Sequence, residues 1–188
     1  MGLQQLVPRR GLLRWGLGLV AAAAAMAPQR ASAKMLTSRL MACGQVSALN
    51  FASPATTTIA VQSTFYTANV TGATVALLSG SEQFDNPSGH QLRYIGAETR
   101  LFHCGCTVSY ATAAGQNQLV GLRLAKSGTS IATSEIRDVC ATNDVDSTAI
   151  HEVIELATND YLEIFVTNHS GTNGVKVNGL NIFAVSAM

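Results

Sequence analysis

Three observations on this 188-residue sequence predict an all-β fold. Several stretches alternate apolar and polar residues, the spacing that places one face of a strand on a core. Gly, Asn, Asp and Ser cluster between these stretches, as they do in tight turns. Charged residues make up only 12% of the chain, which is rich in Thr, Ser, Val and Asn. Roughly eight to ten short strands without a recognisable helix indicate an antiparallel double-sheet jelly-roll sandwich.

The chain divides into three segments by composition. Residues 1–34 form an N-terminal arm, extended or partly helical, or an export signal. Residues 35–56 are a lead-in with one short strand around residues 45–49. Residues 57–188 carry the regular strand and turn pattern, and we expect them to form the jelly-roll domain.

The first half of the domain contains its clearest strand. The stretch "TIAVQSTFYTANV", residues 58–70, alternates β-branched and aromatic residues and predicts a strand. A turn cluster at residues 85–89 precedes a short strand at residues 92–95. Residues 100–111 alternate throughout, so one face of that strand should carry Phe102, Cys104, Cys106, Val108 and Tyr110, and the other Leu101, His103, Thr107 and Ser109.

The second half predicts a hairpin and three further strands. Residues 119–136 form the hairpin, with its turn at Lys126, Ser127 and Gly128. The later strands cover residues 150–156, 161–168 and 175–185, separated by the turn sequences "ATND" and "HSGTNG". The strand at residues 161–166 has apolar side chains on both faces, which suggests that one face packs against another subunit.

Charge is distributed unevenly along the chain, although the net charge is only +1. Six basic residues and no acidic residue precede Glu82, which is the first acidic residue of the chain. From Glu82 onward there are six basic and eleven acidic residues, a balance of −5. A negative domain without a basic patch argues against nucleic-acid contact by the β domain. The basic start instead indicates a targeting segment, or an arm that contacts an acidic partner.

The opening segment resembles a twin-arginine export signal. Arg9 and Arg10 precede an apolar run at residues 15–27, and Ala31-Ser-Ala33 precedes Lys34. A membrane-spanning helix is disfavoured because the apolar run is short and Pro28 follows it at once. Three alternatives stay open: cleavage after Ala33, retention as an arm, or a natural start at Met35 or Met41.

No constellation of residues predicts catalysis, so the expected catalytic, cofactor-binding and metal-binding residues are none. The four histidines fall on different elements: His90, His103, His151 and His169. Nucleophile-elbow and phosphate-loop motifs are absent from the sequence. Asp144 and Asp146 lack the Gly and Glu of a calcium loop, and Glu152 and Glu155 flank a core strand. We therefore expect a protein that is not an enzyme and needs no cofactor.

The four cysteines favour buried thiols over disulfides. Cys104 and Cys106 lie two apart on one strand, where the Cα separation is near the upper limit for a bridge. His103 points to the opposite face from these thiols, which weakens a metal site. A bridge between Cys43 and Cys140 stays open.

The sequence of the domain resembles a known group of jelly rolls. The relevant motifs are Leu92, Tyr94 and Gly96, then Arg100 and Phe102, the hairpin "LRLAKSG", and "LATNDYLEI". They resemble the tumour-necrosis-factor and complement-head modules and, more closely, small jelly-roll structural proteins of tailed phages and other viruses. The resemblance covers residues 57–188 and implies a homotrimer. The hairpin differs from the usual Lys-Asn-Gly by Ser127, and Gly128 still supplies the turn.

Two functions follow as expectations. The first is a virion structural protein, a capsid decoration or cement protein or a fibre, anchored by its N-terminal arm. Its partners would be other capsid or tail proteins, with a host surface receptor or glycan as a further candidate. The alternative is a secreted or periplasmic bacterial protein, a binding or adhesive jelly roll whose signal peptide is cleaved.

Overall fold

The computed structural model describes residues 42–71, 74–80 and 83–187. The predicted N-terminal arm or export signal, residues 1–34, lies outside these residues, as does the apolar run within it. Among the described residues, no helix has the length and apolar character needed to cross a membrane.

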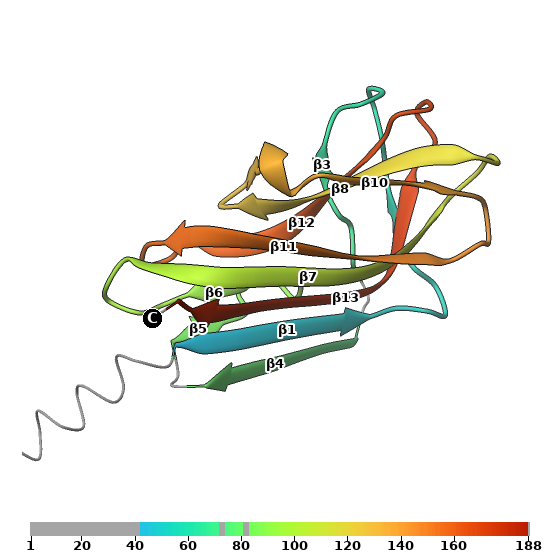
Figure 1. The fold of residues 1–188 in the computed structure, drawn as a ribbon. Helices are drawn as coiled ribbons and strands as arrows, with labels where there is room; N and C mark the ends of the chain where they lie inside the picture. Colours follow the sequence, from blue (N-terminus) through green and yellow to red (C-terminus); the bar gives the residue numbers. More distant parts are fainter. Residues whose placement is uncertain (1–41, 72–73, 81–82, 188) are drawn as a thin grey trace, which may run out of the picture. The chain divides into compact units, whose positions relative to one another are not determined.

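The strands form two antiparallel sheets (Figure 1). The first sheet has the order β11 (Asp146–Leu156), β7 (Arg100–Thr112), β13 (Val175–Ser186), β1 (Cys43–Leu49) and β4 (Thr74–Gly80), with β2 (Thr56–Thr57) beside β13. The second has the order β10 (Ile136–Cys140), β8 (Gln118–Lys126), β12 (Tyr161–Asn168), β6 (Leu92–Tyr94) and β5 (Phe84–Asp85). Two short strands complete the second sheet: β3 (Tyr66–Thr67) beside β12 and β9 (Thr129–Ser130) beside β8.

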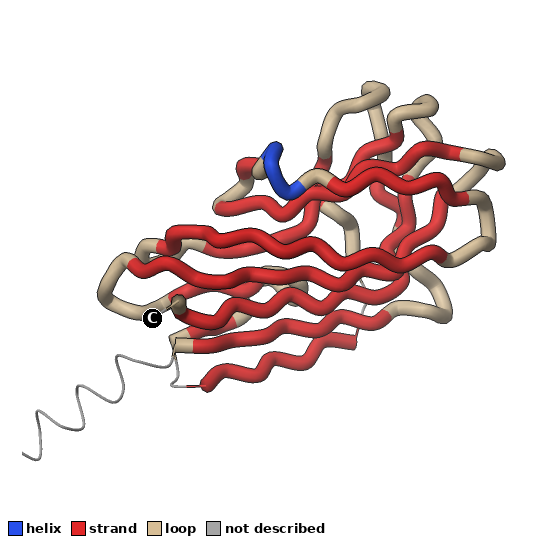
Figure 2. The backbone as a smooth tube through the Cα atoms, in the orientation of Figure 1, coloured by secondary structure: helices blue, strands red, loops and turns tan. Residues whose placement is uncertain are grey.

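The connections between the sheets confirm the predicted jelly roll. The chain passes from one sheet to the other at each step from β2 to β5, and again between β6 and β7, β7 and β8, β10 and β11, β11 and β12, and β12 and β13. Figure 2 shows strands joined by loops, and in the described residues the only helical element is a short 3₁₀ turn, η1 (Ala132–Ser134). The protein is therefore an all-β, antiparallel double-sheet sandwich.

The core lies between the sheets and is built by the inward residues of each strand. The predicted inward residues of β7 are all at most 1% exposed: Phe102, Cys104, Cys106, Val108 and Tyr110. At one end of the core, the rings of Phe84, Tyr94 and Phe102 pack with centroids 5.0–5.4 Å apart. Such aromatic clusters stabilise a core beyond the area that they bury.

The domain begins earlier than the predicted boundary at residue 57. Strand β1 starts at Cys43 and lies between β13 and β4, so residues 43–49 of the lead-in belong to the first sheet. Its inward residues are small, and Gly44 packs on Phe84, whose ring would lie 2.5 Å from a Cβ at that position. Small side chains give a weak alternation signal, which is why the sequence indicates only a short strand there.

Residues 58–70 form mostly loop, although their alternation predicts a strand. Only Tyr66 and Thr67 pair, with β12, and Ser63 has a positive φ of 62° that breaks the extended backbone. Ile59 is nonetheless buried, at 1% exposure. The apolar pattern of this stretch therefore reflects a loop that packs on the sandwich.

The predicted hairpin turn is confirmed. Lys126 pairs with Thr129, which leaves a two-residue turn of Ser127 and Gly128. Their φ values are 49° and 80°, the left-handed pair that matches the twist of a hairpin and favours Gly at the second position.

Candidate functional site

Three of the four cysteines, Cys104, Cys106 and Cys140, are buried thiols, whereas Cys43 is partly exposed on the outward face of β1. All four are free, and the candidate bridge does not form: Cys43 lies on the outward side of the first sheet, whereas Cys140 is buried on the second. Burial raises the pKa of Cys104 to about 12 and of Cys140 to about 11, and it raises that of Cys106 strongly. These three thiols stay protonated at neutral pH and act as small apolar core residues.

Other predicted positions are placed as follows. Asp146 begins β11, where its pKa is raised by burial and by the charges of Asp138 and Asp144. Within residues 42–71, 74–80 and 83–187, no group of three or more His, Cys, Asp or Glu side chains is placed to hold a metal. The sheet does bring two of the scattered histidines together, His103 on β7 and His151 on β11.

The feature that distinguishes this molecule is the outward face of the first sheet. The register of β11, β7, β13, β1 and β4 aligns their outward residues in rows. We call these residues the uncharged face: Ser147, Ala149, His151, Val153, His103, Gly105, Thr107, Ser109, Gly179, Asn181, Phe183, Val185, Cys43, Gln45, Ser47, Leu49, Ala76 and Leu78. None of them is Asp, Glu, Lys or Arg. Leu101 and Glu155 border this face at one end.

Large apolar side chains gather at that end of the uncharged face. Val153, Val185 and Leu78 are 59%, 47% and 66% exposed, and the bordering Leu101 is 51% exposed. Toward the other end most residues are small or hydroxylated, apart from Leu49, which is 51% exposed. Asn181 donates to Ser47 Oγ at 2.9 Å there. A single exposed Leu or Val is ordinary, but several in neighbouring rows form a patch that is typical of an interaction surface.

The uncharged face is hollowed beside Phe183. A hollow of about 290 Å³ is lined by Cys43, Gly44, Gln45, Leu78, Phe183 and Val185. Across β13 from this hollow, Gly105 leaves room for the Phe183 ring, which would lie 2.4 Å from a Cβ at that position.

The outward side of the second sheet is different, because its charges are paired. Arg93 forms a two-point hydrogen bond with Asp85 at 2.6 and 2.8 Å. Arg123 binds Glu135 and stacks on Phe65, 3.9 Å from the ring centroid. These groups satisfy one another within the chain, so this side needs no partner to neutralise them.

On the outward side of the second sheet, one cluster has the residue types of a nucleophilic triad. Ser63 Oγ lies 3.0 Å from His169 Nδ1, and His169 Nε2 lies 3.2 Å from Glu135 Oε1. However, Glu135 is already bound by Arg123 and a second guanidinium, and the Ser63 N–H donates to a carbonyl of β12 rather than toward an oxyanion. We assign this cluster to holding the loop before β3 against the end of β12.

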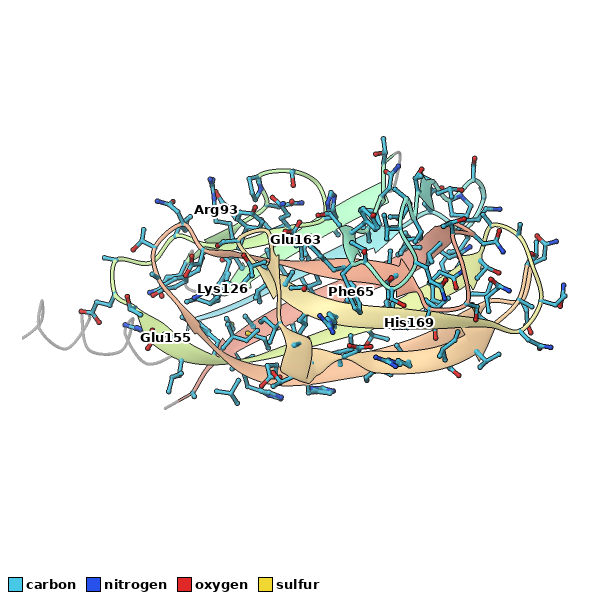
Figure 3. The ribbon with its side chains drawn as sticks, turned by 90° about the horizontal axis from the view of Figure 1, so that it is seen from above. Phe65, Arg93, Lys126, Glu155, Glu163 and His169 are labelled. Carbon is cyan, nitrogen blue, oxygen red and sulfur yellow. The ribbon has the colours of Figure 1, made fainter. Side chains whose placement is uncertain are left out.

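A second hollow, of about 580 Å³, lies between β11 and the segment that contains β9 and η1. Lys126 crosses its end, donating to the Glu155 carbonyl at 2.9 Å and pairing with Asp160 at 3.3 Å. Figure 3 shows Lys126 and Glu155 near each other, and Phe65 and His169 together farther along the strands. The hollow gathers no catalytic set of groups.

The surface that sequence reasoning singled out, the strand at residues 161–166, is not the apolar one. Glu163 is 2% exposed and accepts a hydrogen bond from Gln91 Nε2 at 3.1 Å, so the chain itself covers that part of β12. Nearby His90 has a pKa lowered by burial, against the opposing charge of Glu163. The uncharged face was missed because its signal, alternate positions without charge, is spread over five strands.

Comparisons with known proteins were made for sequence and for structure. No protein-family model matches the chain, and no curated protein matches its sequence. Among solved structures, the chain is similar to murine APRIL, with a TM-score of 0.49 and 10% identity over 77% of this chain and 99% of that chain. It is also similar to PRD1 vertex protein P5, with a TM-score of 0.46 and 13% identity over 77% of this chain and 96% of that chain. Eiger TNF from S. frugiperda follows, with a TM-score of 0.45 and 10% identity over 77% and 92% of the two chains.

Proposed function

We propose that this chain is a virion structural protein, a non-enzymatic jelly roll that forms a homotrimer on the particle surface as a decoration protein or part of a fibre. The observation that carries the proposal is the uncharged face. Exposed protein surfaces are normally about 25–35% charged, whereas the centres of interfaces are depleted of charge. Between Glu155 at one border and Lys176 at the other, the outward rows of these five strands carry no charge, so this face is suited to being covered.

The occupant that fits this face is a further copy of the same chain. A charged partner has nothing to pair with, whereas Ser, Thr, Asn and His side chains both donate and accept hydrogen bonds. Around a threefold axis, different parts of this face can therefore contact the two neighbouring copies in heterologous contacts. Five strands about 4.8 Å apart and about nine residues at about 3.4 Å each give roughly 700 Å². That is close to the ~800 Å² per partner of a stable interface. The resemblance of the domain sequence supports a threefold arrangement.

The virion setting rests on two further observations. The sequence motifs from Leu92 to Ile164 resemble jelly-roll structural proteins of phages and other viruses. All four cysteines are free, and proteins that fold in a reducing cytoplasm, where virions assemble, seldom form disulfides. Residues 1–34 then serve as an arm that binds other capsid or tail proteins, and the receptor or glycan contact falls to the loops.

The second candidate function is an exported bacterial protein with a binding or adhesive jelly roll. It is favoured by one specific observation, the pair Arg9 and Arg10 followed by an apolar run and Ala31-Ser-Ala33. In this case residues 1–33 are removed, and the mature chain is secreted or periplasmic.

Two measurements test the proposal. Sedimentation equilibrium of the full chain should give the mass of three chains, and a monomer whose mass does not change with concentration would contradict the trimer. Mass spectrometry of the N-terminus decides between the two settings. A chain that starts at Met1 or Gly2 in purified particles supports the virion protein, whereas one that starts at Lys34 outside the cytoplasm supports export and overturns the arm.

A further inference from the structure

Two histidines that are far apart in the sequence meet on the uncharged face. In the register of β7 and β11, His103 lies opposite Val153 and His151 lies opposite Gly105, so the two imidazoles are diagonal neighbours. His103 Nε2 is 3.3 Å from His151 Nδ1. The rings are stacked, with centroids 5.3 Å apart and planes inclined by 22°.

The ring of Phe183 packs against both imidazoles, and Gly105 leaves the space that the rings occupy. The edge of Phe183 packs against both, with centroid distances of 5.8 Å to His103 and 6.0 Å to His151. A Cβ at Gly105 would lie 3.1 Å from His151 Nδ1 and 2.4 Å from Phe183. The close approach of these rings therefore depends on glycine at this position.

We propose that His103 and His151 together bind a divalent transition-metal ion of the zinc type. Two nitrogens that bind one tetrahedral zinc at about 2.0–2.1 Å each lie about 3.3–3.4 Å apart. The observed separation of 3.3 Å already matches this spacing. Imidazole prefers zinc, copper and nickel to the harder ions calcium and magnesium, which sets the class of metal.

Binding requires no oxidant and no other residue. In the free protein, the N–H of one facing ring nitrogen forms a hydrogen bond to the other facing nitrogen. When the metal binds, that proton moves to the distant nitrogen of the same ring, and both facing nitrogens give their lone pairs to the metal. Water fills the remaining positions in a single chain. Because both ligands belong to one chain, the proposal does not depend on the trimer.

The surroundings of the pair leave it free for a metal. Its neighbours on the face are Gly105, Val153, Phe183 and Val185, none of which titrates or carries a charge. Glu155, at the border, is the nearest charged residue in the rows of the described face and has the sign that attracts a cation. The Cys104 thiol points into the core and does not compete.

Titration calorimetry of the full-length protein with Zn²⁺ at neutral pH tests the site. We expect one ion per chain, with affinity lowered by more than about tenfold in His103→Gln and in His151→Gln. His90→Gln is the matched control, and it should bind as the unchanged protein does. In mildly acidic buffer the affinity should fall, because protons compete for the same nitrogens.

Two further measurements test whether both histidine rings bind the metal. In a ¹⁵N spectrum of the histidine rings, Zn²⁺ should shift Nε2 of His103 and Nδ1 of His151. Gly105→Ala keeps both ligands but displaces the rings, so it should also weaken binding, while circular dichroism checks that every variant is folded. Absence of saturable Zn²⁺ binding, or an affinity in both glutamine variants equal to that of the unchanged protein, would overturn the proposal.

Discussion

The outward faces of the two sheets contrast sharply in how they treat charge. On the second sheet, Arg93 pairs with Asp85, and Arg123 and Arg137 pair with Glu135. On the first sheet, the uncharged face has no ionic side chain at His103, Gly105, Thr107 and Ser109 of β7 or at the outward described positions aligned with them. The outward side of the second sheet therefore has these charges paired within the chain, whereas the uncharged face of the first sheet is suited to burial against a partner.

This difference separates stability within the chain from association between chains. Partly buried ion pairs stabilise the fold whether or not the protein is assembled, since both partners belong to the same chain. Exposed Val, Leu and Phe side chains contribute little until a partner removes them from water, at about 25 cal/mol per Å² of apolar area. Changes on the two faces should consequently affect different measurements.

The largest effect is expected from a charge placed on the uncharged face. Val185→Asp puts a carboxylate in each copy of the interface, and burying such a charge without a partner costs on the order of 3 kcal/mol or more. The dissociation constant of the trimer should rise by at least about 100-fold, as measured by sedimentation.

The matched control is Val139→Asp on β10. Val139 is 52% exposed and Val185 is 47% exposed, so the two substitutions differ chiefly in the sheet that carries them. If Val139→Asp dissociates the trimer as strongly as Val185→Asp does, the uncharged face is not the interface.

A smaller effect is expected on the charged side, and on folding rather than assembly. Glu135→Gln removes the carboxylate that binds Arg123, Arg137 and His169, and hydrogen bonds to charged groups each contribute about 1.5–3 kcal/mol. The free energy of unfolding in urea should fall by about that amount, while the mass of the assembly stays the same. Glu98→Gln is the control, because the Glu98 side chain is 49% exposed and its pair with Arg100 should contribute under about 1 kcal/mol.

The smallest and most specific effect is the response to acid. Burial alone would raise the pKa of Glu135, but hydrogen bonds and charges from Arg137 and Arg123 outweigh burial and lower it to about 2. A carboxyl whose pKa is lowered by folding stabilises the protein above its unfolded pKa, near 4.5, and this stabilisation is lost as the pH falls toward 2. Urea unfolding between these pH values should show a steady loss of stability that is shallower in Glu135→Gln. Identical slopes in the two proteins would contradict the assignment to Glu135.

The sequence predicts those features that depend on neighbouring residues. The inward face of β7 follows from alternation alone, and the turn at Ser127 and Gly128 follows from residue type. The loop before β3 was mistaken for a strand because its apolar residues pack on the sandwich in the same spacing that a strand would use. Strand β1 was underestimated because small inward residues weaken the pattern that reveals a strand.

By itself, the sequence determined the all-β class, the two-sheet sandwich, the burial of Cys104 and Cys106, and the hairpin turn, because backbone sterics and side-chain alternation act over a few residues. Only the tertiary structure decided which strands lie side by side. His103 and His151 are 48 residues apart in the chain, and the rows of the uncharged face combine residues from Cys43 to Val185. Strand pairing and register are set by long-range packing of the whole core. The surface that we propose for assembly and metal binding therefore forms only when the strands are paired in this register.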